Sequence, residues 1–176
     1  MKHRWEIISR LVMENDYKII SEIGVSRGDN VRAILKILYE LRYKLDQFYL
    51  IDLPDHEKPE CYHFDPNYIF KYHNKIISYL PVSSDKALSY IDDESLDFIF
   101  LDADHSQEGF INDVEKWWVK IRKGGMLCGD DLGGAVNHSC YYRNSYLSTK
   151  FGNQLHREPE IRLSEGQQLD LWWVYK

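Results

Sequence analysis

Acidic side chains stand at the ends of two apolar segments of this chain. The segment LDFIFLDADH ends with Asp102, Asp104 and His105, and the segment MLCGDDL carries Asp130 and Asp131. If both segments are neighbouring parallel strands, these side chains converge at one edge of the sheet. Carboxylates that lie close together repel one another, and a bound divalent cation is the usual resolution. Oxygen ligands favour Mg²⁺, Ca²⁺ or Mn²⁺ over zinc, and the alternative is that the aspartates cap turns and helices.

A histidine follows the first group of carboxylates directly. The unperturbed pKa of histidine, about 6.5, suits the transfer of a proton near neutral pH. His105 is therefore a candidate general base. The alternative is an orienting role, in which its ring bonds an aspartate or a loop carbonyl.

A glycine-rich turn follows an earlier apolar segment. Residues 22–28 have the form E-x-G-x-x-x-G. Glycine lets the backbone turn sharply and lets a ligand approach closely. The N-terminus of a following helix offers free N–H groups to a negative group, and Asn30 could hold a carboxylate there. The dinucleotide fingerprint G-x-G-x-x-G is absent, which argues against a dehydrogenase.

Polar residues also follow the next two strands expected along the chain. Asp52 ends the segment QFYLIDL, where an acidic side chain can accept hydrogen bonds from both hydroxyls of a ribose. The alternative for Asp52 is a loop-capping aspartate. Ser83 and Ser84 follow the segment KIISYL and could contact an adenine edge, cap a helix, or do both.

These residues need a sheet to bring them together, and the pattern along the chain predicts one. Strand-like and helix-like segments alternate, which favours an α/β fold with a mostly parallel central sheet and helices on both faces. Five strands are expected at residues 17–25, 47–53, 75–80, 96–103 and 126–132. Two further candidates, 161–163 and 169–175, predict an antiparallel C-terminal hairpin at the sheet edge, for seven strands in all.

The helices are expected between these strands. The first sixteen residues have the pattern of an amphipathic helix. Another helix is expected over about 109–121, ended by Gly124 and Gly125. The segment 54–67 holds three prolines and is expected to be a loop, and 133–152 shows no pattern that we recognise.

Length and composition limit the classes of protein. The 176 residues correspond to a single domain with a real core. A net charge of −6 argues against a large nucleic-acid surface, and without a long apolar run no membrane span is expected. The three cysteines have no metal-ligand spacing, which favours a reducing cytoplasm. Composition leaves the oligomeric state open, a homo-oligomer included.

The stretch from 95 to 132 resembles the class I S-adenosylmethionine (SAM)-dependent O-methyltransferases. It is similar above all to a bacterial branch with the motif D-G-D-H-S-Y-E-G, which here occupies residues 102–109. Ala103 and Gln107 are the departures from that motif. The resemblance extends from Glu22 to about Leu132 and implies the Rossmann-like fold of class I methyltransferases.

The resemblance also implies roles for individual residues. Around the methionine part of SAM it places Glu22, Gly24, Gly28 and Asn30. Asp52 would hold the ribose, Ser83 and Ser84 would lie by the adenine, and Asp102 would border the cofactor. Metal-dependent relatives, among them catechol and sugar O-methyltransferases, carry one aspartate after the fourth strand and an Asp-Asp or Asp-Asn pair after the fifth. That implies Asp102, Asp130 and Asp131 as metal ligands, with Asp104 as the alternative to Asp102.

The leading hypothesis is therefore a SAM-dependent methyltransferase. It would act on a hydroxyl of a small acceptor, such as a sugar or a natural-product intermediate, with help from Mg²⁺ or another divalent cation. The cation would lower the pKa of the hydroxyl, and His105, beside Asp102, would take the proton. One alternative is a non-catalytic SAM-binding or interaction module with the same fold. Another is a metal-dependent hydrolase or a different Rossmann-like enzyme.

Overall fold

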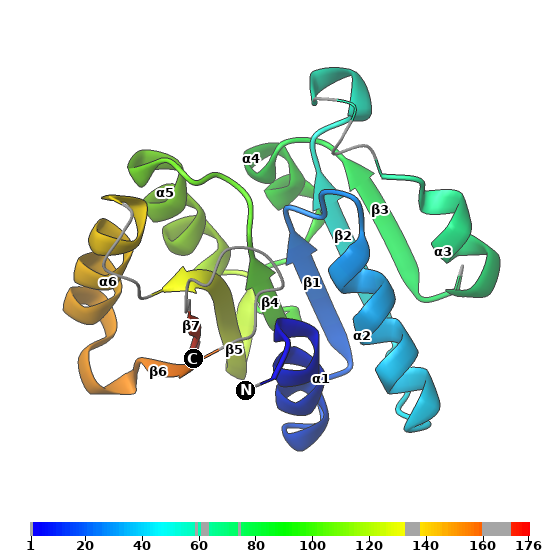
Figure 1. Ribbon diagram of the computed structural model, residues 1–176, viewed down its shortest axis with the longest axis horizontal. Helices are drawn as coiled ribbons and strands as arrows, with labels where there is room; N and C mark the ends of the chain where they lie inside the picture. The colour runs from blue at the N-terminus through cyan, green and yellow to red at the C-terminus, as the bar shows by residue number, and fades with distance from the viewer. Residues whose placement is uncertain (1, 59, 61–63, 74, 133–137, 160–169) are drawn as a thin grey trace.

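The computed structural model describes residues 2–58, 60, 64–73, 75–132, 138–159 and 170–176. These residues form a seven-stranded sheet in the order β3-β2-β1-β4-β5-β7-β6 (Figure 1). The strands are β1 Ile19–Ile23, β2 Gln47–Asp52, β3 Ile77–Pro81, β4 Leu96–Leu101, β5 Ile121–Leu132, β6 His156–Pro159 and β7 Asp170–Tyr175. The first five pair in parallel, and β7 pairs antiparallel with both of its neighbours. The predicted fold class is thereby confirmed.

Helices cover both faces of the sheet (Figure 1). They are α1 Arg4–Glu14, α2 Asp29–Glu40, α3 Pro66–His73, α4 Ser84–Ala87, α5 Gln107–Trp118 and α6 His138–Phe151. Short 3-10 turns add η1 Asp55–Glu57, η3 Leu88–Tyr90 and η4 Gly152–Gln154. One core layer packs side chains of α1, α2 and α3 on the sheet, and the other packs those of α4, α5 and α6.

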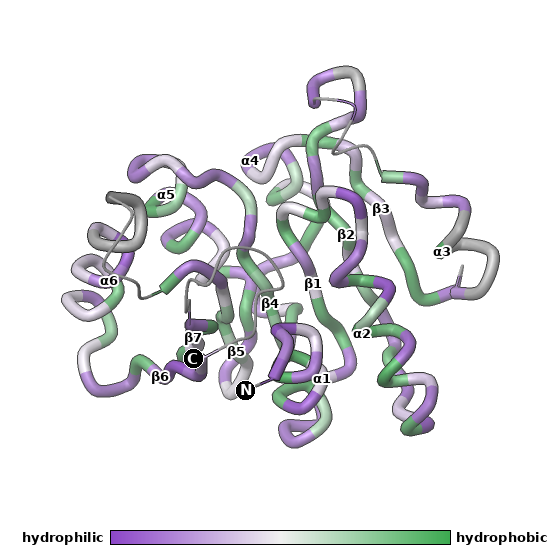
Figure 2. The backbone as a smooth tube through the Cα atoms, in the orientation of Figure 1, coloured by the Kyte–Doolittle hydropathy of each residue, from purple (hydrophilic) through white to green (hydrophobic). Residues whose placement is uncertain are grey.

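The central strand β4 separates the two core layers. Phe98 and Phe100 belong to the layer under α1 and α2, whereas Ile99 and Leu101 belong to the layer under α5 and α6. All six residues of β4 are buried, which explains why this segment is almost continuously apolar in sequence and in Figure 2. Because both faces are covered, only the strand ends are left for a ligand.

The predicted end of the helix over 109–121 is wrong. Helix α5 ends at Trp118, and β5 begins at Ile121, so that Gly124 and Gly125 lie within the strand. A Cβ atom on Gly125 would lie 2.7 Å from the carbonyl oxygen of Asp97. The glycine therefore allows β5 to approach β4, which is a sheet-packing role and not a helix-capping one.

The C-terminal hairpin has the predicted form with a different first strand. Strand β6 lies at His156–Pro159 and pairs with β7 at the edge of the sheet. The expected strand at 161–163 falls outside the described residues. Helix α6 occupies a segment in which the sequence showed no pattern. Among the described residues, every helix is too short or too polar to cross a membrane.

Candidate functional site

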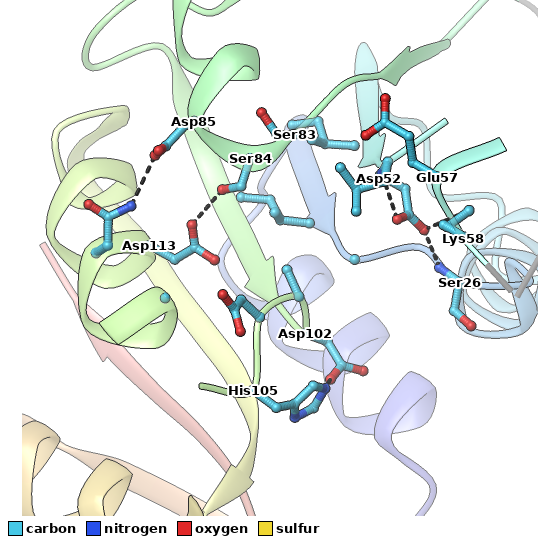
Figure 3. Close-up of a pocket in the computed structure, with 18 of the residues that line it drawn as sticks. Ser26, Asp52, Glu57, Lys58, Ser83, Ser84, Asp85, Asp102, His105 and Asp113 are labelled. Atoms are coloured by element: carbon cyan, nitrogen blue, oxygen red, sulfur yellow. Dashed lines mark hydrogen bonds and ion pairs between the residues drawn. The ribbon is translucent and has the colours of Figure 1, made fainter. Parts of the chain in front are cut away.

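A cavity of about 820 Å³ opens where the parallel strands end. Seven of the residues singled out in the sequence line it, namely Gly24, Asp52, Ser83, Ser84, Asp102, Asp104 and His105. Figure 3 shows Asp52, Ser83, Ser84, Asp102 and His105 around the cavity. They follow β1, β2, β3 and β4 in turn. The sheet therefore brings together residues that lie up to 81 positions apart in the sequence.

Gly24 joins the ends of β1 and β4. Its φ is +91°, and a Cβ atom there would lie 2.0 Å from the carbonyl oxygen of Asp102. The backbone N–H of Asp102 donates to the carbonyl of Ile23 at 2.8 Å, which fixes the two strand ends side by side. Only glycine fits this left-handed turn at such a close approach.

Asp52 is held in one orientation by the backbone. Its Oδ2 accepts from the N–H of Ser26 at 2.6 Å and from Nζ of Lys58 at 3.3 Å, and its Oδ1 accepts from the N–H of Leu53 at 2.7 Å. These are the contacts of a loop-capping carboxylate, and the same carboxylate lines the cavity (Figure 3). The two interpretations of Asp52 are therefore compatible.

The two serines after β3 have different partners. Ser83 is the N-cap of α4, where its Oγ accepts from the N–H of Lys86 at 3.3 Å. Ser84 donates to Oδ1 of Asp113 at 2.5 Å and accepts from Nε1 of Trp117 at 2.7 Å. Burial raises the pKa of Asp113 to about 6. This part of the cavity thus ends on a buried carboxyl that reaches in from α5.

Glu22, Gly28 and Asn30 do not line this cavity. Glu22 is 2% exposed and accepts from Nδ2 of Asn30 at 3.0 Å. Burial, followed by the charge of Asp102, raises the pKa of Glu22 to about 8. Gly28 is the N-cap of α2 with φ +78°, and a Cβ atom on it would clash with the ring of Phe64. All three residues lie in the packing around the turn and not on the cavity wall.

The predicted metal ligands are brought together, but their partners are arginines. Nη1 of Arg4 lies 2.7 Å from Oδ2 of Asp102 and 2.5 Å from Oδ2 of Asp130. Nη1 of Arg143 lies 3.2 Å from Oδ2 of Asp131. Burial and the neighbouring Asp130 raise the pKa of Asp102 to about 7, against the opposing charge of Arg4.

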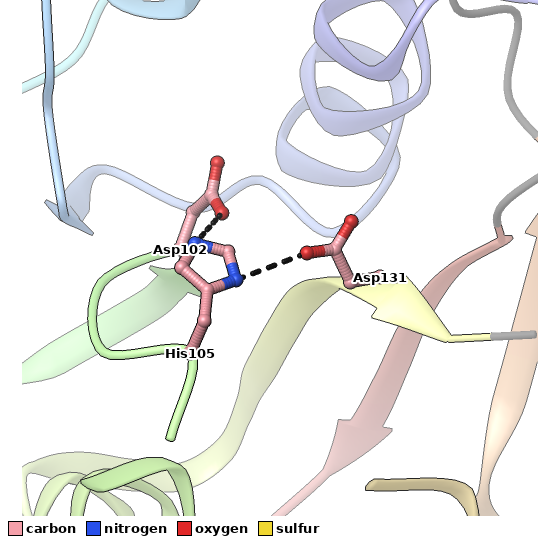
Figure 4. Close-up of side chains that lie close together, drawn as sticks. All are labelled: Asp102, His105 and Asp131. Carbon is pink, nitrogen blue, oxygen red and sulfur yellow. Dashed lines mark ion pairs between the residues drawn. The ribbon is translucent and has the colours of Figure 1, made fainter. Parts of the chain in front are cut away.

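His105 lies between two of these carboxylates (Figure 4). Its Nδ1 is 3.1 Å from Oδ2 of Asp131, and its Nε2 is 3.7 Å from Oδ1 of Asp102. The hydrogen bond with Asp131 raises the pKa of His105. Nη2 of Arg143 also lies 3.0 Å from Nδ1, so this atom either donates to Asp131 or accepts from Arg143. The ring is therefore oriented by Asp131 in the first state and by Arg143 in the second.

Asp102, His105 and Asp131 are also spaced as a cation could be held. One ligand atom from each lies within 4.8 Å of the other two. Asp104 is outside this group, and its Oδ1 accepts from the backbone N–H of Ser106 at 2.8 Å as a turn-capping carboxylate. Geometry thus favours Asp102 over Asp104 as the carboxylate that works with His105.

The electrostatic character of the cavity is acidic. Six carboxylates line it, namely Asp52, Glu57, Asp85, Asp102, Asp104 and Asp113. Two basic side chains, Arg4 and Lys58, also line it, together with His105. A concave surface of this kind attracts a positively charged ligand.

Four contacting residues had not been expected from the sequence, namely Arg4, Lys58, Asp113 and Arg143. Asp113 faces Ser84 across 29 positions, and Arg4 reaches Asp130 across 126. Arg143 lies in a helix that sequence reasoning did not find. Asp113 carried a usable signal, because an aspartate on the inner stripe of an amphipathic helix needs a partner.

Comparison with known proteins decides between the enzyme classes that share this architecture. A family model described as a methyltransferase domain matches residues 21–132, which hold every strand end that lines the cavity. The chain belongs to the methyltransferase domain family. The prediction of a methyltransferase is therefore confirmed, and a hydrolase or a dehydrogenase is not supported.

Solved structures show how widely this methyltransferase fold is shared. An O-methyltransferase from Bacillus cereus, solved in complex with S-adenosylhomocysteine (SAH), superposes with a TM-score of 0.69 at 17% identity, covering 98% of this chain and 80% of the other. The 1,6-didemethyltoxoflavin-N1-methyltransferase of Burkholderia thailandensis, solved with 1,6-didemethyltoxoflavin and SAH, gives 0.67 at 10% identity, covering 98% and 77%. No curated protein sequence matches the chain significantly.

Proposed function

We propose that this methyltransferase transfers the methyl group of SAM to a hydroxyl of a small acceptor bound in the cavity. The observation that carries the proposal is the acidic cavity at the ends of four consecutive parallel strands, with Gly24, Asp52 and Asp102 on its wall. SAM carries a positive sulfonium and an ammonium group, so an excess of carboxylates suits it. The Bacillus cereus structure with SAH supports the same donor.

The residues on the cavity wall suggest how the donor lies. Asp52 is proposed to receive the ribose hydroxyls, because its position after β2 is the ribose position of nucleotide-binding α/β sheets. Ser83 and Ser84 are proposed to lie by the adenine, with Asp113 behind Ser84. For Glu22, Gly28 and Asn30 we propose an indirect role, since they support the turn that carries Gly24.

SAM, when bound, supplies a methyl group that is already activated by the positive sulfur. The protein must then align the acceptor oxygen with that methyl group and take up the hydroxyl proton. Nε2 of His105 is the proposed proton acceptor, while Nδ1 donates to Asp131. Asp131 thereby holds the ring and stabilises its protonated form. The charge of Asp102, 3.7 Å from Nε2, also favours the protonated ring.

Assistance by a divalent cation stays a prediction from the sequence. Of the three predicted ligands, Asp102 and Asp130 contact Arg4, and Asp131 contacts Arg143. These carboxylates are thus compensated by the chain itself, and they do not form a free ligand set. The proposed mechanism therefore uses no metal-dependent step.

Turnover on matched acceptors tests the proposal. The protein is incubated with SAM and two panels, one of hydroxylated sugars and phenols and one of the corresponding amines, and released SAH and methylated product are measured. We expect SAH that depends on a hydroxylated acceptor. Activity with amines alone would mean that the methyl group is accepted by nitrogen, as the name of the Burkholderia neighbour states for that enzyme. Binding of SAH without turnover on either panel would favour the non-catalytic alternative.

A further inference from the structure

Arg4, the first residue of α1, reaches into the carboxylate cluster formed by Asp102, Asp130 and Asp131. A single nitrogen, Nη1, contacts Oδ2 of both Asp102 and Asp130, at 2.7 and 2.5 Å. One positive group thus bridges two carboxylates from different strands, as a single metal ion does in an acidic site. The side chain of Arg4 also lines the cavity and is 28% exposed.

A second arginine adds to the charge compensation of the cluster. Arg143 of α6 is 4% exposed, lies 3.2 Å from Asp131 and packs its guanidinium over the ring of Phe110 at 4.8 Å. Guanidinium groups stay protonated in proteins, so Arg4 and Arg143 supply two permanent charges. The repulsion that would otherwise call for a divalent cation is largely relieved by side chains of this chain.

The position of Arg4 also opposes a cation directly. A metal bridging Asp102 and Asp130 would bind the same Oδ2 atoms that now contact Nη1. Such an ion would approach a guanidinium of like charge, because metal–oxygen bonds of about 2.0–2.6 Å leave no room for both on one pair of oxygens. Helix α1 keeps the arginine there, since Ile7, Ile8 and Leu11 are buried in the core.

We propose that Arg4 takes the place of a divalent cation in this site, so that α1 is part of the active site and the protein works without a metal. The proposal rests on the proposed function, because it treats the cluster as the acceptor end of a methyltransferase site. The guanidinium of Arg4 is a fixed donor on the cavity wall that positions an acceptor oxygen without exchanging protons. A bound metal ion is not required for this role.

Binding of Mn²⁺ alone to the chelator-treated protein tests the proposal, measured by the electron paramagnetic resonance signal of free Mn²⁺ and by calorimetry. The variant is Arg4→Gln, which removes the charge and keeps a polar side chain. The matched control is Arg10→Gln on the same helix, whose arginine pairs with Glu14 and Glu158. We expect Arg4→Gln to bind Mn²⁺ at least tenfold more tightly than the wild type, and Arg10→Gln to match the wild type.

Two results would overturn the proposal. One is an affinity of Arg4→Gln that lies within tenfold of the wild-type affinity. The other is micromolar binding of Mn²⁺ by the wild type. If circular dichroism shows that Arg4→Gln does not fold, the Mn²⁺ affinity of the wild type is the test. Absence of Mn²⁺ binding by the wild type below millimolar concentration then supports the proposal. A parallel titration with SAH separates the proposed function from the proposed role of Arg4. If the wild type does not bind SAH but gives the expected Mn²⁺ result, only the proposed function is refuted.

Discussion

The Cα atom of Gly24 faces the main-chain carbonyl of Asp102 so closely that a Cβ atom would lie 2.0 Å from its oxygen. The close approach accompanies the hydrogen bond from the N–H of Asp102 to the carbonyl of Ile23, which joins the ends of β1 and β4. It also makes one position of the E-x-G-x-x-x-G turn strictly dependent on glycine.

Replacing Gly24 by alanine should therefore damage both stability and binding. The φ of +91° strains alanine by about 1–3 kcal/mol, and the displaced Asp102 adds to that cost. Urea unfolding and SAH calorimetry measure the two effects. Gly152→Ala is the matched control, because Gly152 has φ +54° and its Cβ would meet nothing within 4 Å. Equal losses of stability in the two variants would contradict the role given to the contact.

Ser84 is expected to stabilise the far end of the cavity. Ser84→Ala leaves the carboxyl of Asp113 and the indole N–H of Trp117 without the hydroxyl that joins them. Leaving buried polar groups unpaired should lower the free energy of unfolding by about 1–3 kcal/mol. Ser89→Ala, which removes an exposed hydroxyl five residues further along the chain, should change it by less than about 0.5 kcal/mol. A loss in Ser84→Ala no larger than in Ser89→Ala would refute this interpretation.

Glu22 should make the protein less stable as the pH rises. Its pKa is raised from 4.5 to about 8 in the folded state, so between these values the folded protein keeps a proton that the unfolded chain releases. The free energy of unfolding then falls with rising pH, by at most about 1.4 kcal/mol per unit, and the loss is complete above pH 8.

Glu22→Gln removes this titration while keeping an acceptor for Asn30. In urea unfolding across that range of pH, the stability of Glu22→Gln relative to wild type should rise with pH. Glu40→Gln on the exposed end of α2 should follow the wild type. Parallel profiles for wild type and Glu22→Gln would mean that Glu22 is ionised throughout.

His105 should affect turnover and spare donor binding. If its Nε2 takes the hydroxyl proton, His105→Gln should lower kcat by about 10²–10⁴-fold, the usual contribution of a general base. SAH affinity should stay within a few-fold, because His105 is placed at the acceptor end of the site. His156→Gln, at a histidine that stacks on Trp173 in the C-terminal hairpin, is the control. An unchanged kcat in His105→Gln would show that His105 is not the general base and would leave it an orienting role only.

The features that could be predicted from the sequence share one property. Each is determined by residues that are close together along the chain. Strand β4 is apolar because both of its faces are covered, and the run of apolar residues in its sequence indicates this directly. Gly24, Asp52 and Asp102 each follow such a run, so the rule that parallel strands end at one edge was enough to bring them together.

The features that sequence reasoning missed depend on tertiary contacts. Gly124 and Gly125 resemble a helix end in sequence, but the close approach of β5 to Asp97 decides their role. Arg4 is an ordinary surface-type residue of an amphipathic helix until α1 packs and brings it to Asp130, 126 positions away. A pattern of acidic residues alone therefore predicts a cation site and contains no sign of the arginine that compensates it.

Calorimetric titration of SAH into the wild type and into Asp52→Asn tests the central claim most directly. We expect saturable binding to the wild type and binding at least about tenfold weaker to Asp52→Asn, since lost hydrogen bonds to a charged group cost about 1.5–3 kcal/mol. Asp46→Asn, at an exposed aspartate before β2, should bind as the wild type does. No heat of binding to the folded wild type at millimolar SAH, or equal affinity in Asp52→Asn, would contradict a SAM site in this cavity.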